Sequence, residues 1–227
     1  MLFFSLLWQS PFWLEGIFHH KMEMLAALLS FWCVWLAAKN NLLNWPVAML
    51  GSCLYAIVFF QSALYSDAFL NVVFLGFQGF GWYTWKRKAQ KSVESLPDQV
   101  ANDRPVKAQF SQILWVLLVG LVCYYPWTLF VKGGTVQQWI APESFQPPRF
   151  LYLDASLFIL SICALYMQAK RWIQHWWIWI LIDVVYVPVY IVNENHITAL
   201  LYFFYIPLAI KGYQLWNLNL PERKAID

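Results

Sequence analysis

Seven long apolar segments limit what this chain can fold into. They cover residues 22–38, 42–64, 68–85, 110–131, 151–169, 172–192 and 197–216. A helix that crosses the hydrocarbon core of a bilayer needs about 20 mostly apolar residues, and each segment approaches or reaches that length. A transmembrane barrel would instead show alternating segments of about ten residues. The sequence therefore predicts an all-α membrane protein with seven transmembrane helices.

The composition leaves little mass for a soluble domain. Hydrophobic residues make up 61% of the chain and charged residues 12%, which is about half the charge of a typical soluble domain. Because the net charge of +3 has no soluble basic face to act on, we expect no nucleic-acid partner, and the lipid bilayer is the main partner. The cysteines lie in apolar segments and are expected to be small buried hydrophobes, namely Cys33, Cys53, Cys123 and Cys163.

The connecting segments divide the chain further. Residues 1–21 are apolar but interrupted by polar residues and Pro11, and they lack the basic start of a signal peptide, so we expect an interfacial helix. Residues 86–109 hold nine of the 27 charged residues and are expected to be a cytoplasmic loop. Residues 132–150 are read as an external loop and 217–227 as a cytoplasmic tail. With 86–109 inside, twelve Lys and Arg residues lie inside and three outside, which predicts an external N-terminus and a cytoplasmic C-terminus.

An internal repeat relates the two ends of the chain. A shift of 131 residues places 23–85 on 154–216 without a gap, and charged, Gly and Trp landmarks coincide. The matched pairs are Glu23 with Asp154, Lys39 with Lys170, Trp45 with Trp176, Tyr55 with Tyr186, Gly81 with Gly212, and Trp85 with Trp216. The span at 110–131 then separates two three-helix repeats, 22–85 and 151–216. This predicts a parallel 3+1+3 arrangement, and transporters built from repeats bind substrate near the midplane between them.

Polar and aromatic residues recur at steps of three and four within the repeats, which keeps them on one helical face. Since a lipid-facing surface has no use for such stripes, we expect them to face inward. The candidate ligand-binding residues are Ser52, Tyr55, Asn71, Gln78, Trp176, Trp179, Asp183, Tyr186, Tyr202 and Tyr205.

Asp183 is the most informative candidate because it lies near the middle of its span. A carboxylate there costs about 2.5–3.5 kcal/mol on insertion scales. It either lines a cavity and contacts a polar or cationic ligand, or it is hydrogen-bonded to a neighbouring Tyr or Trp. Under the 131-residue shift Asp183 matches Ser52, so the two sides of the cavity would differ in chemistry, as an asymmetric ligand requires.

The other candidates also have structural readings. Gln78 and Asn71 can bond a ligand amide or hydroxyl, or join two helices. Trp176 and Trp179 can stack on a ring, or belong to the aromatic belt at the membrane surface. The chain has neither the His-Glu-x-x-His nor the Gly-x-Ser-x-Gly pattern, so no catalytic residue is expected. A retinal-type sensor would need a lysine near mid-span, and Lys211 lies toward the inner end.

Several motifs resemble one family. Asn44-Trp45-Pro46, Tyr55, Leu64-Tyr65-Ser66-Asp67, Leu70-Asn71 and Gly81-Trp82-Tyr83-Thr84-Trp85 are similar to the first half of PnuC-type nicotinamide riboside transporters, and the resemblance covers about 22–216. It implies a bacterial inner-membrane vitamin transporter, similar in plan to SWEET proteins, assembled as a homotrimer and without a cofactor. It also implies facilitated diffusion with trapping by cytoplasmic phosphorylation, which feeds NAD biosynthesis. Relatives carry thiamine or riboflavin, so the vitamin stays open.

Overall fold

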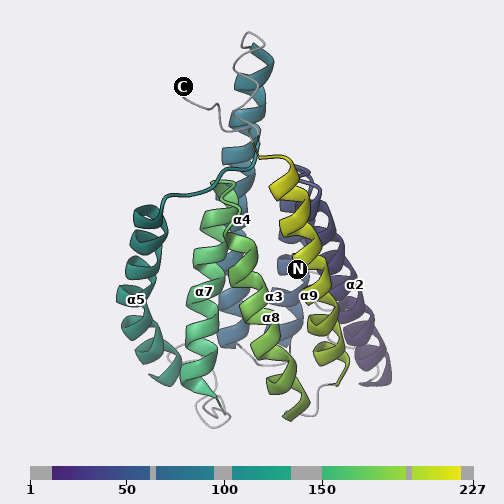
Figure 1. Ribbon diagram of the computed structural model, residues 1–227. Helices are drawn as coiled ribbons and strands as arrows, with labels where there is room; N and C mark the ends of the chain where they lie inside the picture. The colour runs from purple at the N-terminus through teal and green to yellow at the C-terminus, as the bar shows by residue number, and fades with distance from the viewer. Residues whose placement is uncertain (1–11, 62–64, 95–103, 134–149, 193–195, 221–227) are drawn as a thin grey trace, which may run out of the picture.

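The fold consists of helices throughout the described part of the chain (Figure 1). The computed structural model describes residues 12–61, 65–94, 104–133, 150–192 and 196–220. The helices are α2 Phe12–Ala38, α3 Asn44–Gln61, α4 Tyr65–Glu94, α5 Phe110–Gly133, α7 Leu151–Ala169, α8 His175–Val192 and α9 His196–Leu218.

Six of these helices form a closed ring. The packed pairs are α2 with α3, α3 with α4, α4 with α7, α7 with α8, α8 with α9, and α9 with α2. Helix α5 packs against α7 outside the ring and stands at the left of Figure 1. The first three-helix unit (α2–α4) therefore meets the second (α7–α9) along two seams, α2 with α9 and α4 with α7.

The 131-residue shift found in the sequence also relates the helix boundaries. Helices α2 and α7 end at Ala38 and Ala169, and 169 − 38 = 131. The same difference separates the first residues of α3 and α8 (175 − 44), their last residues (192 − 61), and the first residues of α4 and α9 (196 − 65).

The turns that follow α2 and α7 match as well. Asn40 has a φ of 53° and Arg171 a φ of 60°, again 131 residues apart. The Asn40 amide donates to the carbonyl of Ala37 at 2.9 Å, and the Arg171 amide donates to that of Gln168 at the same distance. A left-handed residue that returns a hydrogen bond to the last helical turn is a common helix C-terminus. The two units therefore share a turn geometry, although the residues at the left-handed position, Asn40 and Arg171, are of different types.

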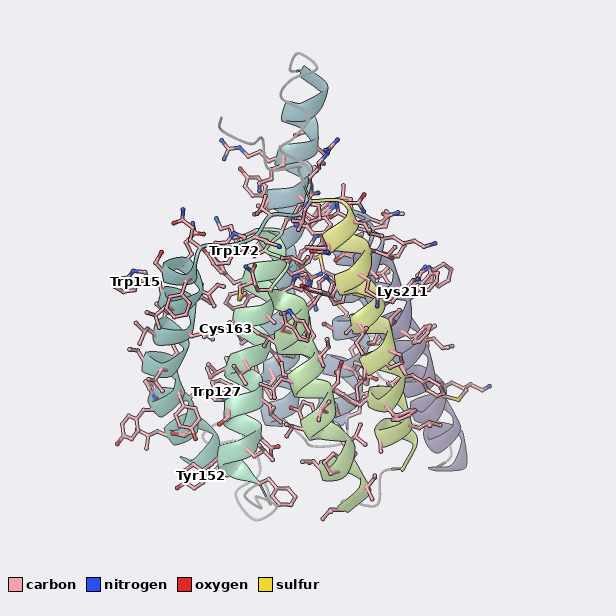
Figure 2. All side chains as sticks on the ribbon, in the orientation of Figure 1. Trp115, Trp127, Tyr152, Cys163, Trp172 and Lys211 are labelled. Atoms are coloured by element: carbon pink, nitrogen blue, oxygen red, sulfur yellow. The ribbon has the colours of Figure 1, made fainter. Side chains whose placement is uncertain are left out.

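Four helices are long and apolar enough to cross a membrane within the described residues: Asn44–Gln61, Phe110–Leu129, Leu151–Ala169 and His175–Val192. The apolar part of α2, Met24–Ala38, is shorter, and α4 and α9 fall below the same hydropathy. Large apolar side chains cover the outside of the bundle, and Figure 2 shows Trp115 and Tyr152 directed away from it. A surface of this kind is suited to lipid and not to water.

The structure differs from the sequence-based expectations at some boundaries. Helix α2 begins at Phe12 and passes through the predicted boundary at residue 21; residues 1–11 of the expected interfacial helix lie outside the described residues. Helix α4 continues to Glu94, into the predicted loop 86–109, because Lys, Arg, Gln and Ala favour helix. Cys53 and Cys123 are exposed, so the prediction that every cysteine is buried is wrong. Their helix faces point outward, where a small apolar side chain is equally stable against lipid.

Candidate functional site

Four tryptophans close the end of the ring that the sequence predicts to be cytoplasmic, which we call the inner end. Trp45 and Trp85 lie edge to face at 5.5 Å, Trp176 and Trp216 do the same at 5.7 Å, and the rings of Trp85 and Trp216 are 6.1 Å apart. Each of these side chains is 2% exposed or less. Trp176, a predicted ligand contact, therefore lies in a packed tryptophan cluster two turns from Asp183, and its contact with a ligand stays a prediction.

Two members of the tryptophan cluster also bond across the seams. The indole nitrogen of Trp85 donates to the carbonyls of Gln168 and Ala169, both at 3.2 Å. The indole nitrogen of Trp216 donates to the carbonyl of Ala37 at 2.9 Å. Because Gln168 and Ala37 are 131 residues apart, the two contacts are equivalent, and each unit completes the end of a helix in the other.

Asp183 lies halfway along α8 and is 4% exposed, so it faces the interior of the ring and not the lipid. It is close enough to Tyr202 and Tyr205 for electrostatic interaction. Among the described residues, however, none donates a hydrogen bond to its carboxylate or forms an ion pair with it. Burying a carboxylate without a partner is costly, so the site is suited to a group that brings positive charge or hydrogen-bond donors.

The equivalent position in the first unit has a partner. Gln78 of α4 donates a hydrogen bond from its amide to the Ser52 hydroxyl at 2.9 Å, and both side chains are buried. The 131-residue shift places Asp183 at the position of Ser52 and Ala209 at that of Gln78. Ala209 is buried but cannot bond to the carboxylate. The amide oxygen of Gln78 is itself buried and lacks a hydrogen-bond partner among the described residues.

A cluster of tyrosine rings from α8 and α9 lies near Asp183 in the second unit. The ring of Tyr202 lies 5.0 Å from Tyr186, 5.2 Å from Tyr190 and 5.6 Å from Tyr205. Phe31 of α2 stacks on Tyr205 at 6.5 Å, across the seam between α2 and α9. Within the described residues, the buried Tyr205 hydroxyl makes no hydrogen bond of good geometry. The structure thus brings three predicted residues together with Tyr190 and Phe31.

The remaining candidates lie around this centre. Tyr55 stacks on Phe59 at 5.7 Å, one turn from Ser52. Trp179 is half-buried and packs against the tryptophan cluster one turn from Asp183. Asn71 is half-buried on the outer half of α4 and has a partner of its own. Phe31, which the sequence-based list omitted, carries no periodic polar signal, so its position could be found only from the packing of α2 on α9.

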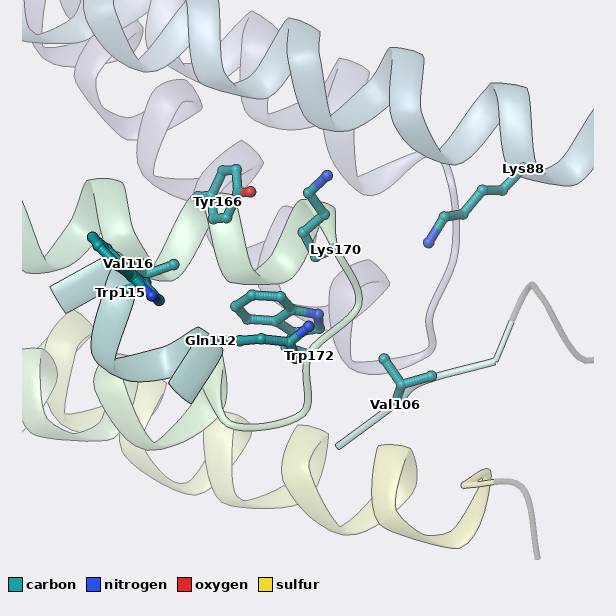
Figure 3. Close-up of a pocket in the computed structure, with 8 residues that line it drawn as sticks. All are labelled: Lys88, Val106, Gln112, Trp115, Val116, Tyr166, Lys170 and Trp172. Atoms are coloured by element: carbon teal, nitrogen blue, oxygen red, sulfur yellow. The ribbon is translucent and has the colours of Figure 1, made fainter. Parts of the chain in front are cut away.

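Two cavities lie outside the ring, beside α5. One of about 540 Å³ opens at the inner end between α4, α5 and α7 (Figure 3). A second, of about 310 Å³, lies between α5 and α7 and is lined mainly by apolar side chains. Neither is lined by Asp183 or by a tyrosine of the cluster described above.

A ring of apolar helices around a buried carboxylate, an amide and several tyrosines is the architecture of a multi-pass membrane transporter. Comparison with known families agrees with this class: the family model described as nicotinamide mononucleotide transporter matches residues 20–218. The chain belongs to this PnuC-type family.

Individual relatives are distant but cover most of the chain. The nicotinamide riboside transporter PnuC of Escherichia coli (strain K12) is 25% identical over an alignment of 212 residues, and the match covers 89% of this chain and 87% of that protein. The riboflavin/roseoflavin transporter RibM of Streptomyces davaonensis is 26% identical over 197 residues, 87% and 84% of the two chains. A crystal structure of the vitamin B3 transporter PnuC matches with a TM-score of 0.62 at 19% identity, over 88% and 82% of the chains. The last likeness shows the fold.

Proposed function

We propose that this protein carries a cationic, ring-containing vitamin, with nicotinamide riboside as the first candidate, through a site between the two three-helix units. The observation that carries the proposal is the buried Asp183 carboxylate, which has no cationic or hydrogen-bonding partner among the described residues. A pyridinium ring supplies the missing positive charge. The Escherichia coli relative is a nicotinamide riboside transporter, which supports the same ligand.

The surrounding residues suit the rest of such a ligand. Tyr186, Tyr202 and Tyr205 offer ring faces to a cationic ring, and each cation–π contact contributes about 0.5–2 kcal/mol. Trp176 and Trp179 extend the aromatic wall toward the inner end. Gln78, with a buried and unbonded amide oxygen, accepts a hydrogen bond from a ribose hydroxyl or an amide. Asn71, Ser52 and Tyr55 complete the polar side of the site in the first unit.

The transport mechanism that we propose is the one that the family resemblance implies. The two units are parallel repeats in a 3+1+3 order, with α5 as the extra crossing, and they rock about the central site. With the N-terminus outside and the C-terminus in the cytoplasm of a bacterium, the vitamin enters by facilitated diffusion through the inner membrane. Phosphorylation in the cytoplasm traps it for NAD biosynthesis. The functional assembly is a homotrimer.

Riboflavin is the second candidate, because the relative RibM has a percentage identity to this chain (26%) close to that of the Escherichia coli nicotinamide riboside transporter (25%). Thiamine is a third, since it is also cationic. Riboflavin is neutral, so it offers a buried carboxylate hydroxyl and N–H donors but no positive charge. Asp183 therefore favours the two cationic vitamins.

Calorimetry on detergent-purified protein tests the proposal with nicotinamide riboside, thiamine and riboflavin. Replacing Asp183 with Asn keeps the shape and removes the charge, and loss of one partner of a buried charge pair costs about 2 kcal/mol or more, or about 30-fold in affinity. The matched control is Asp154→Asn at the outer end of α7, which should bind like the unchanged protein. Binding of the cation that is unaffected by Asp183→Asn, or tighter binding of riboflavin than of either cation, would contradict the proposal.

A further inference from the structure

The larger cavity beside α5 has the chemistry of an anion site. Its lining residues are Lys88, Val106, Gln112, Trp115, Val116, Tyr166, Lys170 and Trp172. The two lysines come from different helices, and Figure 3 shows Lys88 reaching toward the pocket while Lys170 lies on the other wall. The ammonium of Lys170 is 5.5 Å from the centre of the Tyr166 ring, which packs edge to face against Trp172 at 6.1 Å.

The wall of this pocket is held in place by hydrogen bonds to the turn between α7 and α8. The Val106 amide donates to the carbonyl of Arg171 at 2.9 Å, and the Ile173 amide donates to the carbonyl of Val106 at 3.0 Å. The Gln174 side chain bonds both backbone groups of Ala108, at 3.1 and 3.0 Å. The chain before α5 is therefore fixed against the second unit, and the pocket is part of the fold.

The surroundings of the pocket indicate where its ligand comes from. The pocket lies at the end of the bundle that carries Lys86, Arg87, Arg104 and Lys107, while Asp154 lies toward the opposite end. Trp115 of α5 lines the pocket itself, and further along the two helices toward the middle of the bundle Phe80 of α4 and Val119 and Val122 of α5 are exposed apolar side chains. A ligand here meets two cations at its head and an apolar surface beneath.

We infer that this pocket binds the headgroup of an anionic phospholipid from the inner leaflet, with the phosphate between Lys88 and Lys170. Basic pockets between transmembrane helices at the cytoplasmic surface select such lipids. A soluble phosphate would have no use for the apolar surface on α4 and α5. The acyl chains of a lipid lie against it.

The other three-helix unit provides a matched control. The residue equivalent to Lys170 is Lys39, which also ends a helix and also lies near an aromatic ring, 4.6 Å from the centre of Trp35. Helix α5 forms one wall of the pocket at Lys170 and packs on α7 of the second unit. Lys39, in the first unit, lines neither of the two cavities described above. Lys170→Gln and Lys39→Gln therefore remove the same charge at the same depth, and they differ in the pocket.

The experiment is native mass spectrometry of the detergent-purified full chain, titrated with dioleoyl phosphatidylglycerol, dioleoyl phosphatidylcholine and glycerol 3-phosphate. The anionic lipid should bind more tightly than the zwitterionic one, and glycerol 3-phosphate should show no comparable binding. A basic residue near an anionic surface contributes about 1 kcal/mol, or about fivefold in affinity. Lys170→Gln should thus weaken phosphatidylglycerol binding about fivefold, the double variant with Lys88→Gln about 25-fold, and Lys39→Gln less than twofold.

Other outcomes overturn the inference. Equal binding of the two lipids would remove the role of charge, and equal loss in Lys170→Gln and Lys39→Gln would remove the role of the pocket. Tight binding of glycerol 3-phosphate would assign the pocket to a soluble phosphate, and a changed oligomer mass without a change in lipid binding would assign it to a second copy of the chain. A loss of lipid binding in Lys170→Gln that comes only from lower stability would show as a lower unfolding temperature than that of Lys39→Gln without lipid. In that case the single variant Lys88→Gln tests the inference: it should weaken phosphatidylglycerol binding about fivefold, and unchanged binding would overturn the inference.

Discussion

Gly81 offers a sharp test of the tryptophan packing that closes the inner end of the ring. A Cβ added at this position would meet three ring carbons of Trp45 well inside 3.0 Å. The indole has no free space to move into, because Trp45 is 1% exposed and lies edge to face on Trp85. We therefore expect Gly81→Ala to destabilise the protein, although alanine favours helix.

The size of the effect follows from a comparison within α4. Alanine in place of glycine in a helix gains about 1 kcal/mol, and this gain is common to Gly81 and to Gly76, where an added Cβ would meet nothing within 4 Å. The two variants then differ by the cost of overpacking, about 1–3 kcal/mol. At roughly 2–4 °C per kcal/mol, their apparent melting temperatures should be separated by about 2–12 °C, with Gly76→Ala the higher.

The assay is thermal unfolding in detergent, followed by the fraction of monodisperse protein. Gly212→Ala should repeat the loss, since an added Cβ there would meet the ring of Trp176 at 2.5 Å. Adding Trp45→Leu to Gly81→Ala should remove much of the penalty, as expected for two residues in contact. Equal shifts for Gly81→Ala and Gly76→Ala would refute this account of the packing.

Two further predictions concern the seam and the site. Trp85→Phe removes the indole donor to the end of α7 and should lower the free energy of unfolding by about 1–3 kcal/mol in the same assay. The control Trp82→Phe, at a position 39% exposed, should change this stability little. Similar losses in both variants would contradict a role for the indole hydrogen bond. If the ring of Tyr186 stacks on the ligand, Tyr186→Phe should weaken vitamin binding less than Tyr186→Ala in calorimetry, and similar losses would point to the hydroxyl.

The helices could be predicted because membrane thickness sets the length of an apolar run, whatever its neighbours are. The end of α4 could not, because the change from Trp85 to Lys86 marks the exit from the apolar region and not the end of the helix. Charged residues such as those at 86–91 continue a helix well in water. Similarly, the left-handed residues Asn40 and Arg171 share a backbone geometry that no common residue type indicates.

The site could be predicted in part for a related reason. Periodicity correctly indicated that Asp183 and Trp176 lie on one inward face of α8, since both are buried. It could not indicate what they meet, because that depends on α9, where Gly212 admits the indole and Ala209 leaves the carboxylate without a bond. The neighbour from another helix decides whether a buried side chain is packed or available.

The bonds that Trp85 and Trp216 make across the seams have a consequence for folding. Each indole donates to a carbonyl in the last turn of a helix in the opposite half of the chain, in addition to the turn amide that bonds the Gln168 or Ala37 carbonyl, and loss of the indole bond in an apolar setting weakens that helix end. A nascent chain in which one half has emerged and the other has not would keep a frayed helix terminus. The halves are thus expected to become ordered together, in a single cooperative transition that a truncated chain cannot complete.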